Sequence, residues 1–321
     1  MFPSLFAARI ASAGLMVLGP GMVYGQDYPN KTIRILASGP GSGGDFTARL
    51  IAQGVAPGLG QPVIVDNRAG SLVASEAAAK SPPDGYTLLV NGASLWIIPL
   101  LQRVSYDATR DFSPISLVER GSMIMAVHPS LPVKSVKELI AMSKAKPGEL
   151  NYAASGIGGP THLAGELFKS MSGVNIVAVP YKGGTAASIT ALITGEVHMT
   201  MMDTYLMVPH VKSGKMRALA VTGPEPSALA PGLPTVAASG LPGYEATPMT
   251  GILAPAKTPA AIISRLNQEG LRVLSRPESK ERYLNAGVEV VGSTPEQFAA
   301  ILKTEIAKTG KIIRDTGIKV D

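Results

Sequence analysis

The sequence predicts an α/β protein of two lobes, each built on a mostly parallel sheet flanked by helices. Strand-like and helix-like segments alternate along two separate stretches of the chain, a pattern typical of parallel sheets covered on both faces. The length of 321 residues and the hydrophobic content of 45% suggest two lobes with large cores rather than one. Two long C-terminal helical segments follow without strands of their own to cover. We therefore expect them to return to the first lobe, so that the chain crosses between the lobes twice.

The first alternating series opens with the apolar run TIRILA and closes with YTLLV. Apolar positions define the strands, and a broad apolar face at helical spacing defines the first helix. In order, the expected elements are a strand at 32–37, a helix at 45–55, a buried strand at 62–66, an Ala-rich helix at 73–80 and a strand at 86–90.

The second series begins near Pro129 and ends before a Pro/Gly-rich surface crossing at 224–243. Its expected helices are 135–142, 161–171, 185–195 and 206–214, and its expected strands are 150–155, 175–181, 197–203 and 217–223. After the crossing we expect a strand at 250–255 and helices at 259–274 and 295–313. The resulting boundaries are 26–127 plus 247–321 for the first lobe and 128–246 for the second, with a ligand cleft between them.

The first 25 residues have the composition of a secretory signal peptide. They carry one charge, Arg9, followed by an apolar run at 10–18, a Gly-Pro-Gly break and the small residues Val23 and Gly25 before a cut ahead of Gln26. The apolar run is shorter than the roughly 20 residues of a membrane span. We therefore expect a secreted, periplasmic protein. Because the chain has no Cys, its fold depends on its core rather than on disulfides, and no lipoprotein anchor is available.

The formal net charge of +6 is dispersed along the chain. No basic stripe is interleaved with aromatic residues, so we expect no nucleic-acid partner. A mild positive field suits an anionic small molecule.

Three glycine-bearing loops each follow a strand and precede a helix, and they are the main candidates for a binding site. The first N–H groups of a helix lack internal partners, and the helix dipole makes that end attractive to anions. One such loop alone fits a tight turn with a capped helix equally well. Three at the carboxyl ends of parallel strands favour a ligand cleft. The candidate ligand-binding residues of these loops are Gly39, Pro40, Gly41, Ser42, Ser155, Gly158, Gly159, Thr161, His162, Gly183, Gly184 and Thr185. Asp45 is a further candidate helix cap.

A dinucleotide site is the alternative interpretation of the first loop. Its letters GPGSGG satisfy G-x-G-x-x-G, and Asp66 follows at about the spacing of a ribose-binding acid. However, Asp45 directly follows Gly44 and would repel a phosphate unless it faces away. The motif is also weak in a Gly-rich chain, and a secreted protein has poor access to nicotinamide cofactors. We rank this enzyme hypothesis last and expect no cofactor.

Other catalytic arrangements are missing from the sequence. The four His form no metal-spaced pair, and Ser155 lacks the flanking glycines of a nucleophile elbow. We therefore expect no enzyme, no catalytic residue and no metal site. Asp203 ends a very apolar strand, either as a cap for the next helix or as a carboxylate that binds a hydrogen-bond donor or an ammonium group. Ser94 and Trp96 follow the strand at 86–90, and Trp96 belongs either to the core or to a ligand platform.

The chain resembles the Bug/TctC family of extracytoplasmic solute receptors over essentially its whole mature length. The resemblance lies in motifs in order, among them PGSGGDFTARLIA, LGQPVIVDNRAG, PPDGYTLLV, LNYAASGIGGPTHLAGELFKSM, VPYKGGTAA and HVKSGKMRALAVTG. It implies a type II periplasmic binding protein that closes over a carboxylated metabolite and engages the permease of a tripartite tricarboxylate transport system. It also implies that backbone amides, hydroxyls and ordered water hold the ligand carboxylate, and that Asp203 matches the acid ending a strand of the second lobe.

Two segments depart from the family pattern. Residues 247–251 lack the two aromatics that relatives often carry, and Leu95 and Trp96 replace smaller or more polar residues. These departures suggest a different distal group on the ligand. A sensory partner that presents its ligand to a membrane kinase is the second alternative, because it would bind identically. We expect a monomer.

Overall fold

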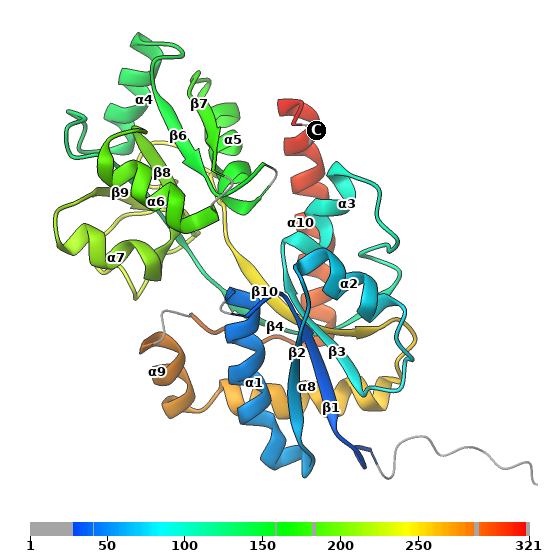
Figure 1. The fold of residues 1–321 in the computed structure, drawn as a ribbon. Coiled ribbons are helices and arrows are strands. Elements are labelled where there is room, and N and C mark those ends of the chain that lie inside the picture. Colours follow the sequence, from blue (N-terminus) through cyan, green and yellow to red (C-terminus); the bar gives the residue numbers. More distant parts are fainter. Residues whose placement is uncertain (1–27, 41, 158, 182–183, 286–288, 319–321) are drawn as a thin grey trace, which may run out of the picture.

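The computed structural model describes residues 28–40, 42–157, 159–181, 184–285 and 289–318. Within them the chain forms two α/β lobes joined by two adjacent crossing segments (Figure 1). The expected signal peptide at 1–25 lies outside the described residues, as do Gly41, Gly158 and Gly183.

The first lobe contains a five-stranded sheet in the order β2-β1-β3-β10-β4. Its strands are β1 (Ile33–Ala37), β2 (Val63–Asn67), β3 (Thr87–Gly92), β4 (Phe112–Arg120) and β10 (Met249–Pro255). Its helices are α1 (Gly43–Leu59), α2 (Ser71–Ala79), α3 (Ser94–Leu101), α8 (Ala260–Leu274), α9 (Pro277–Asn285) and α10 (Pro295–Thr316). Helices α1 and α8 share one buried cluster with the sheet, and α2, α3 and α10 share another. Side chains of β1 alternate between the two faces of the sheet, which separates the two clusters. Ile33 and Ile35 belong to the first cluster and Leu36 belongs to the second.

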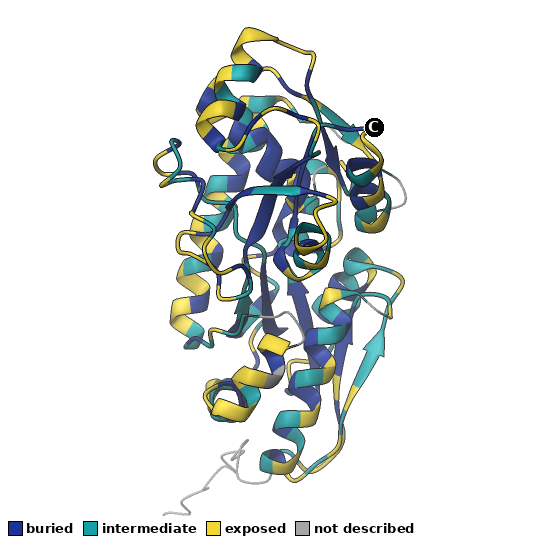
Figure 2. Ribbon diagram, turned by 90° about the vertical axis from the view of Figure 1, so that its left-hand side faces the viewer, coloured by how far each residue is buried: buried dark blue, intermediate teal, exposed yellow. Residues whose placement is uncertain are grey.

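The second lobe contains a five-stranded sheet in the order β7-β6-β8-β5-β9. Its strands are β5 (Met123–Val127), β6 (Asn151–Ala154), β7 (Val177–Pro180), β8 (Met199–Asp203) and β9 (Arg217–Val221). Its helices are α4 (Val136–Ala145), α5 (Pro160–Ser172), α6 (Gly184–Thr194) and α7 (Thr204–Lys212). One buried cluster holds residues of α4 and α5, and the other holds residues of α6 and α7. Figure 2 shows buried strands between helices whose outer faces are exposed.

Both sheets are mixed, with one strand in each running against the other four. That strand is β10 in the first sheet and β5 in the second. Each is the strand with which the chain enters a sheet from the other lobe. Because β5 pairs with β8 and β9, the change of sheet falls between Arg120 and Met123. The expected boundary at 127 is corrected by this pairing, since residues 123–127 form a fully buried strand of the second lobe.

Helix α10 belongs to the first lobe and packs against both lobes on the side of α3. It packs on β4 and α3 of the first lobe and also contacts α5 of the second (Figure 1). Thr294 caps it, and the Gln297 side chain completes a capping box. Among the described helices none is both long and apolar enough to span a bilayer.

Candidate ligand-binding site

A cavity of about 540 Å³ with many hydroxyl groups in its wall lies between the two lobes, and we call it the cleft cavity. Helices α1, α2, α3, α5, α6 and α7 all begin at its wall, because each follows the carboxyl end of a strand. Hydroxyl side chains contributed by these helix starts and the preceding residues are Ser38, Ser42, Ser71, Ser94, Ser155, Thr161, Thr185 and Thr204. The cavity therefore offers a small ligand both hydroxyl groups and helix amino ends.

The first glycine loop is closed by two serines. Ser42 caps α1, since its Oγ accepts a hydrogen bond from the Asp45 N–H at 3.2 Å. The hydroxyl of Ser38 lies 2.7 Å from that of Ser42. A Cβ on Gly44 would lie 2.9 Å from Ser38 Oγ, so a larger residue here would displace the Ser38 hydroxyl from Ser42.

Asp45 faces away from the cavity and is not the helix cap, which corrects that expectation. It is buried, its carboxylate lies 2.9 Å from Arg49 Nε, and Asn67 donates a hydrogen bond to it at 2.8 Å. Asp66, the acid of the dinucleotide alternative, pairs with Arg68 at 2.7 Å and lies 3.7 Å from Arg34. Both carboxylates are thus engaged by guanidinium groups outside the cavity lining.

The second glycine loop is organised by Thr161 at the start of α5. Its Oγ1 accepts a hydrogen bond from the Ser155 N–H at 2.9 Å and lies 2.9 Å from Ser155 Oγ. Gly156 has φ 148°, a conformation that other residues rarely adopt. Both Ser155 and Thr161 line the cavity.

His162 does not line the cavity. Its ring is buried, stacks on Tyr152 and lies 3.9 Å from the Glu166 carboxylate. Burial lowers the pKa of His162, although the Glu166 charge opposes this shift. These contacts indicate that His162 packs at the start of α5 rather than contacting a ligand.

The other candidate residues divide between the cavity wall and its surroundings. Gly39, Pro40, Gly159 and Gly184 belong to the same loops but do not line the cavity. Trp96 is only 5% exposed and packs in the core between α2, α3 and α10. It therefore contributes to the core and not to the wall of the cleft cavity.

Asp203 and Glu119 face the cleft cavity from opposite lobes. Asp203 occupies the cap position of α7, but its side chain makes no capping hydrogen bond. Burial, followed by the negative charge of Glu119, raises the pKa of Asp203 to about 6. Burial also raises the pKa of Glu119, while hydrogen bonds from two hydroxyls oppose the shift.

Glu119 and its two hydroxyl partners were not predicted from the sequence. Thr47 on α1 donates to Glu119 Oε2 at 2.8 Å, and Thr250 on β10 donates to Oε1 at 2.7 Å. Thr250 belongs to the departing segment at 247–251, which also contributes Pro248 and Met249 to the cavity wall. A single acid near the end of the apolar run at 112–118 was the available signal.

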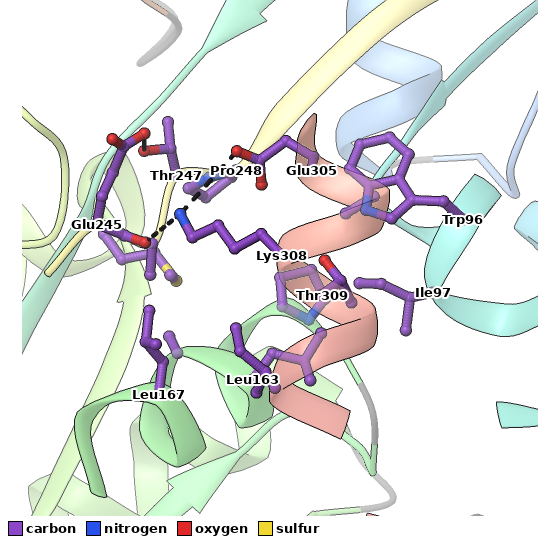
Figure 3. A pocket seen from close by; sticks show the side chains of 16 residues that line it. Trp96, Ile97, Leu163, Leu167, Glu245, Thr247, Pro248, Glu305, Lys308 and Thr309 are labelled. Atoms are coloured by element: carbon purple, nitrogen blue, oxygen red, sulfur yellow. Dashed lines mark hydrogen bonds and ion pairs between the residues drawn. The ribbon is translucent and has the colours of Figure 1, made fainter. Parts of the chain in front are cut away.

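A second, smaller pocket of about 60 Å³ adjoins the cleft cavity beside the crossings, and we call it the hinge pocket. Trp96 and Ile97 of α3, Leu163 and Leu167 of α5, Thr247 and Pro248 of the second crossing, and Thr309 and Ile312 of α10 line it (Figure 3). The Lys308 ammonium lies next to it, donates to the Glu245 carbonyl at 2.7 Å and lies 4.0 Å from Glu305.

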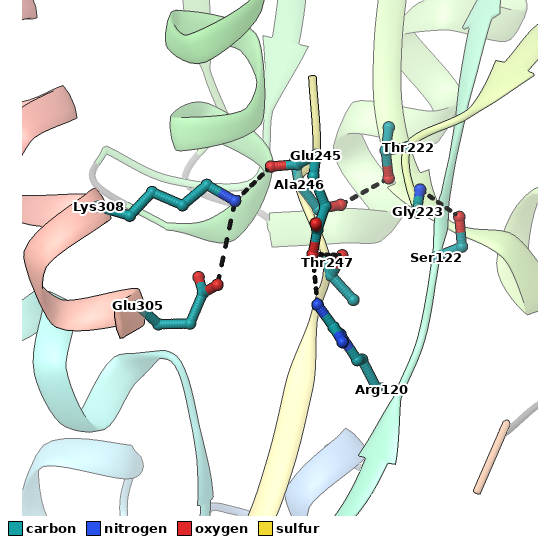
Figure 4. Close-up of polar contacts among 9 residues, drawn as sticks. All are labelled: Arg120, Ser122, Thr222, Gly223, Glu245, Ala246, Thr247, Glu305 and Lys308. Atoms are coloured by element: carbon teal, nitrogen blue, oxygen red, sulfur yellow. Dashed lines mark hydrogen bonds and ion pairs between the residues drawn. The ribbon is translucent and has the colours of Figure 1, made fainter. Parts of the chain in front are cut away.

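The two crossings are tied to each other at the hinge (Figure 4). The Gly121 N–H donates to the Pro248 carbonyl at 2.8 Å. The Thr222 hydroxyl accepts from the Met123 N–H at 2.9 Å and donates to the Ala246 carbonyl at 2.7 Å. The Arg120 guanidinium pairs with Glu245. Cations thus gather at the hinge, whereas no Lys, Arg or His lines the cleft cavity among the described residues.

Comparison with known proteins places this geometry in a family. The TctC family, described as Tripartite tricarboxylate transporter family receptor, matches residues 47–318. Protein BugT of Bordetella pertussis is 32% identical over 97% of this chain and 98% of its own length.

Solved structures of similar proteins share both the fold and part of the sequence. R. palustris Rpa4515 with adipate is 34% identical, with a TM-score of 0.79 over 91% of this chain and 99% of that one. MatC from Rhodopseudomonas palustris with bound malate is 27% identical, with a TM-score of 0.73 over 89% of this chain and 100% of that one. The fold with two α/β lobes, the cavity between them and these matches together show that the chain belongs to the Bug/TctC family of solute receptors.

Proposed function

We propose that this chain is a periplasmic receptor that captures a small carboxylate in the cleft cavity and delivers it to a tripartite tricarboxylate-type permease. The observation that carries this proposal is the hydroxyl-lined cavity between the lobes, at whose wall six helices begin. Two similar proteins hold adipate and malate, which are small carboxylates.

The ligand carboxylate docks at the starts of α1 and α5. Ser42 and Gly43 contribute from the first lobe, and Ser155 and Thr161 contribute from the second. Hydrogen bonds to a charged group stabilise a complex by about 1.5–3 kcal/mol each, so three or four are enough for micromolar binding after ordering costs.

Closure follows because the ligand contacts both lobes only when they approach. Such a ligand binds the closed form more tightly and shifts the population toward it. The two crossings between Arg120 and Met123 and between Glu245 and Pro248 are short and bonded to each other, so they are the place where the lobes rotate.

The test is a thermal-shift screen of the purified chain without residues 1–25 against mono-, di- and tricarboxylates, aromatic acids and amino acids. A ligand at about 100 times its Kd adds about 2.7 kcal/mol to the free energy of unfolding. Small-angle X-ray scattering of the protein with the best ligand should show a smaller radius of gyration. Silence across the whole panel, with a response to NAD, would reject the receptor in favour of the cofactor enzyme.

Delivery to a permease needs a separate measurement, because a sensory partner would bind the same ligand. Affinity capture from membranes with the ligand-loaded protein should recover permease subunits. Recovery of a membrane kinase instead would favour the sensory alternative.

A further inference from the structure

The two carboxylates that face the cleft cavity are incompletely satisfied by the protein. Glu119 accepts one hydroxyl hydrogen bond at each oxygen, from Thr47 and Thr250. A carboxylate has about four acceptor positions, so Glu119 retains capacity toward the cavity. Among the described residues, none donates a hydrogen bond to the Asp203 carboxylate.

Two arginines of the described elements that border the cavity are already engaged elsewhere. Arg49 pairs with Asp45, and Arg120 pairs with Glu245. A third acid at the cavity wall, Glu289, accepts a hydrogen bond from Ser227 at 2.5 Å. In the described part of the wall, the acidic groups therefore have hydroxyl partners or none, and no cationic one.

The position of the two acids links their charge to lobe closure. Glu119 belongs to β4 of the first lobe and Asp203 to β8 of the second, and the negative charge of Glu119 acts on Asp203. Like charges at short range repel in a partly buried site. Closure brings the lobes together against this repulsion unless a cation lies between the two groups.

We propose that the ligand carries an ammonium group beside its carboxylate, and that this ammonium lies between Asp203 and Glu119. The preferred substrate class is then a small amino acid rather than an unsubstituted di- or tricarboxylate. This inference rests on the proposed receptor function and adds the chemistry of the second ligand group.

An ammonium fits this position better than a neutral donor. It has three N–H donors, enough for both carboxylates and for a nearby hydroxyl such as that of Thr204 or Tyr205 at the same wall. A hydroxyl has one donor and leaves both negative charges unneutralised. A second ligand carboxylate in this place would add a third negative charge.

The resulting site has two ends of opposite character. The helix starts and hydroxyls of α1 and α5 take the ligand carboxylate, and the acids at the ends of β4 and β8 take the ammonium. The ammonium contacts both lobes, so it contributes directly to closure.

Matched ligand pairs test the inference by isothermal titration calorimetry. The pairs are aspartate and succinate, glutamate and glutarate, 2-aminoadipate and adipate, and phenylalanine and 3-phenylpropanoate, with both enantiomers of each amino acid. In at least one pair the amino member should bind at least about tenfold more tightly, which corresponds to about 1.4 kcal/mol. Equal or tighter binding of the deaminated member in every pair that binds would overturn the inference and leave the receptor proposal standing.

The pH dependence gives a second readout with opposite signs for the two ligand classes. As pH rises from 5 to 7.5 Asp203 becomes ionised, because its pKa is about 6, so the amino member should bind more tightly and its deaminated partner more weakly. The groups facing this position are Asp203, Glu119, Glu289 and Tyr205. The amino ligands keep their own charges over this range. Parallel pH profiles for both members would contradict the inference.

Substitutions then locate the effect. D203N and E119Q should each reduce the preference for the amino member at least about tenfold, while E149Q, at an exposed acid outside the cavity, should leave it unchanged. If no carboxylate of either class binds the wild-type protein, the receptor proposal fails and takes this inference with it.

Discussion

The cleft cavity and the hinge pocket adjoin each other but differ in the polarity and charge of their surroundings. They share Ala93, Met123, Pro160 and Pro248 as wall residues. The wall of the cleft cavity is rich in hydroxyl groups. It also contains acidic side chains, and none of the described Lys, Arg or His side chains forms an ion pair with them. The hinge pocket is mainly apolar, and the cations beside it are fixed to the crossings. In the described residues, cations are therefore placed at the hinge, and our proposal assigns anion recognition in the cleft to hydroxyls and helix amino ends.

The strongest test of this contrast removes one hydroxyl from the cleft. T161V keeps the shape of the side chain but removes the partner of the Ser155 N–H and hydroxyl. The variant also removes a hydroxyl from the proposed carboxylate position, and a hydrogen bond to a charged group contributes about 1.5–3 kcal/mol. We expect the affinity for the best carboxylate to fall about 30-fold by calorimetry. T190V, at an exposed hydroxyl bonded within α6, is the matched control and should bind normally. Unchanged affinity in T161V would separate this loop from the site.

The next test removes an ion pair at the hinge and leaves the residues of the cleft cavity unchanged. R120M leaves the half-buried Glu245 carboxylate without its guanidinium, so we expect the free energy of unfolding to fall by about 1–3 kcal/mol. Urea denaturation measures this loss, and calorimetry should show a smaller change in ligand affinity. The double variant R120M/E245Q should recover part of the stability, because it also removes the unpaired carboxylate. A loss of affinity larger than the loss of stability would mean that the hinge cation acts on the ligand.

The acid of the cleft should behave in the opposite way to the cation of the hinge. The pKa of Asp203 is raised from 3.8 to about 6 in the folded protein, so the unfolded chain loses this proton first as pH rises. The free energy of unfolding then decreases between about pH 4 and pH 6 and stays lower above that range. D203N escapes this penalty and should be more stable above pH 6, by on the order of 1–3 kcal/mol. Melting temperatures measured from pH 4 to 8 should diverge as pH rises. A less stable D203N protein at pH 7.5 would show that Asp203 has a stabilising partner.

The sequence predicted the parts of this molecule that depend on local periodicity. The alternating series lead to β1–β3 and β6–β9 with their helices, and the glycine loops lie where parallel strands end. No helix or strand was predicted at β4, β5, α3 or α9. Strands β4 and β5 are separated only by Gly121 and Ser122, so nothing in the local pattern shows that the chain changes sheets there.

The loops and helix starts that line the cleft cavity were predictable from the sequence, but the acidic residue Glu119 in its wall was not. Ser42, Ser94, Ser155, Thr161, Thr185 and Asp203 were named from the sequence and line the cavity. Glu119 was not, because its partners Thr47 and Thr250 lie 72 and 131 residues away along the chain. Trp96 fitted two interpretations, since its position after a strand says nothing about which way the ring packs.

The smallest expected effect separates these two interpretations of Trp96. The ring is 5% exposed and lies in the buried cluster of α2, α3 and α10, at the wall of the hinge pocket and not of the cleft cavity. W96F should therefore lower the free energy of unfolding by about 1–2 kcal/mol through lost packing and change ligand affinity less than about twofold. F46L is the matched comparison, because Phe46 does line the cleft cavity and its truncation should weaken binding more than W96F does. If W96F weakens binding more than F46L, ligands extend from the cleft cavity into the hinge pocket, and the two regions act as one site.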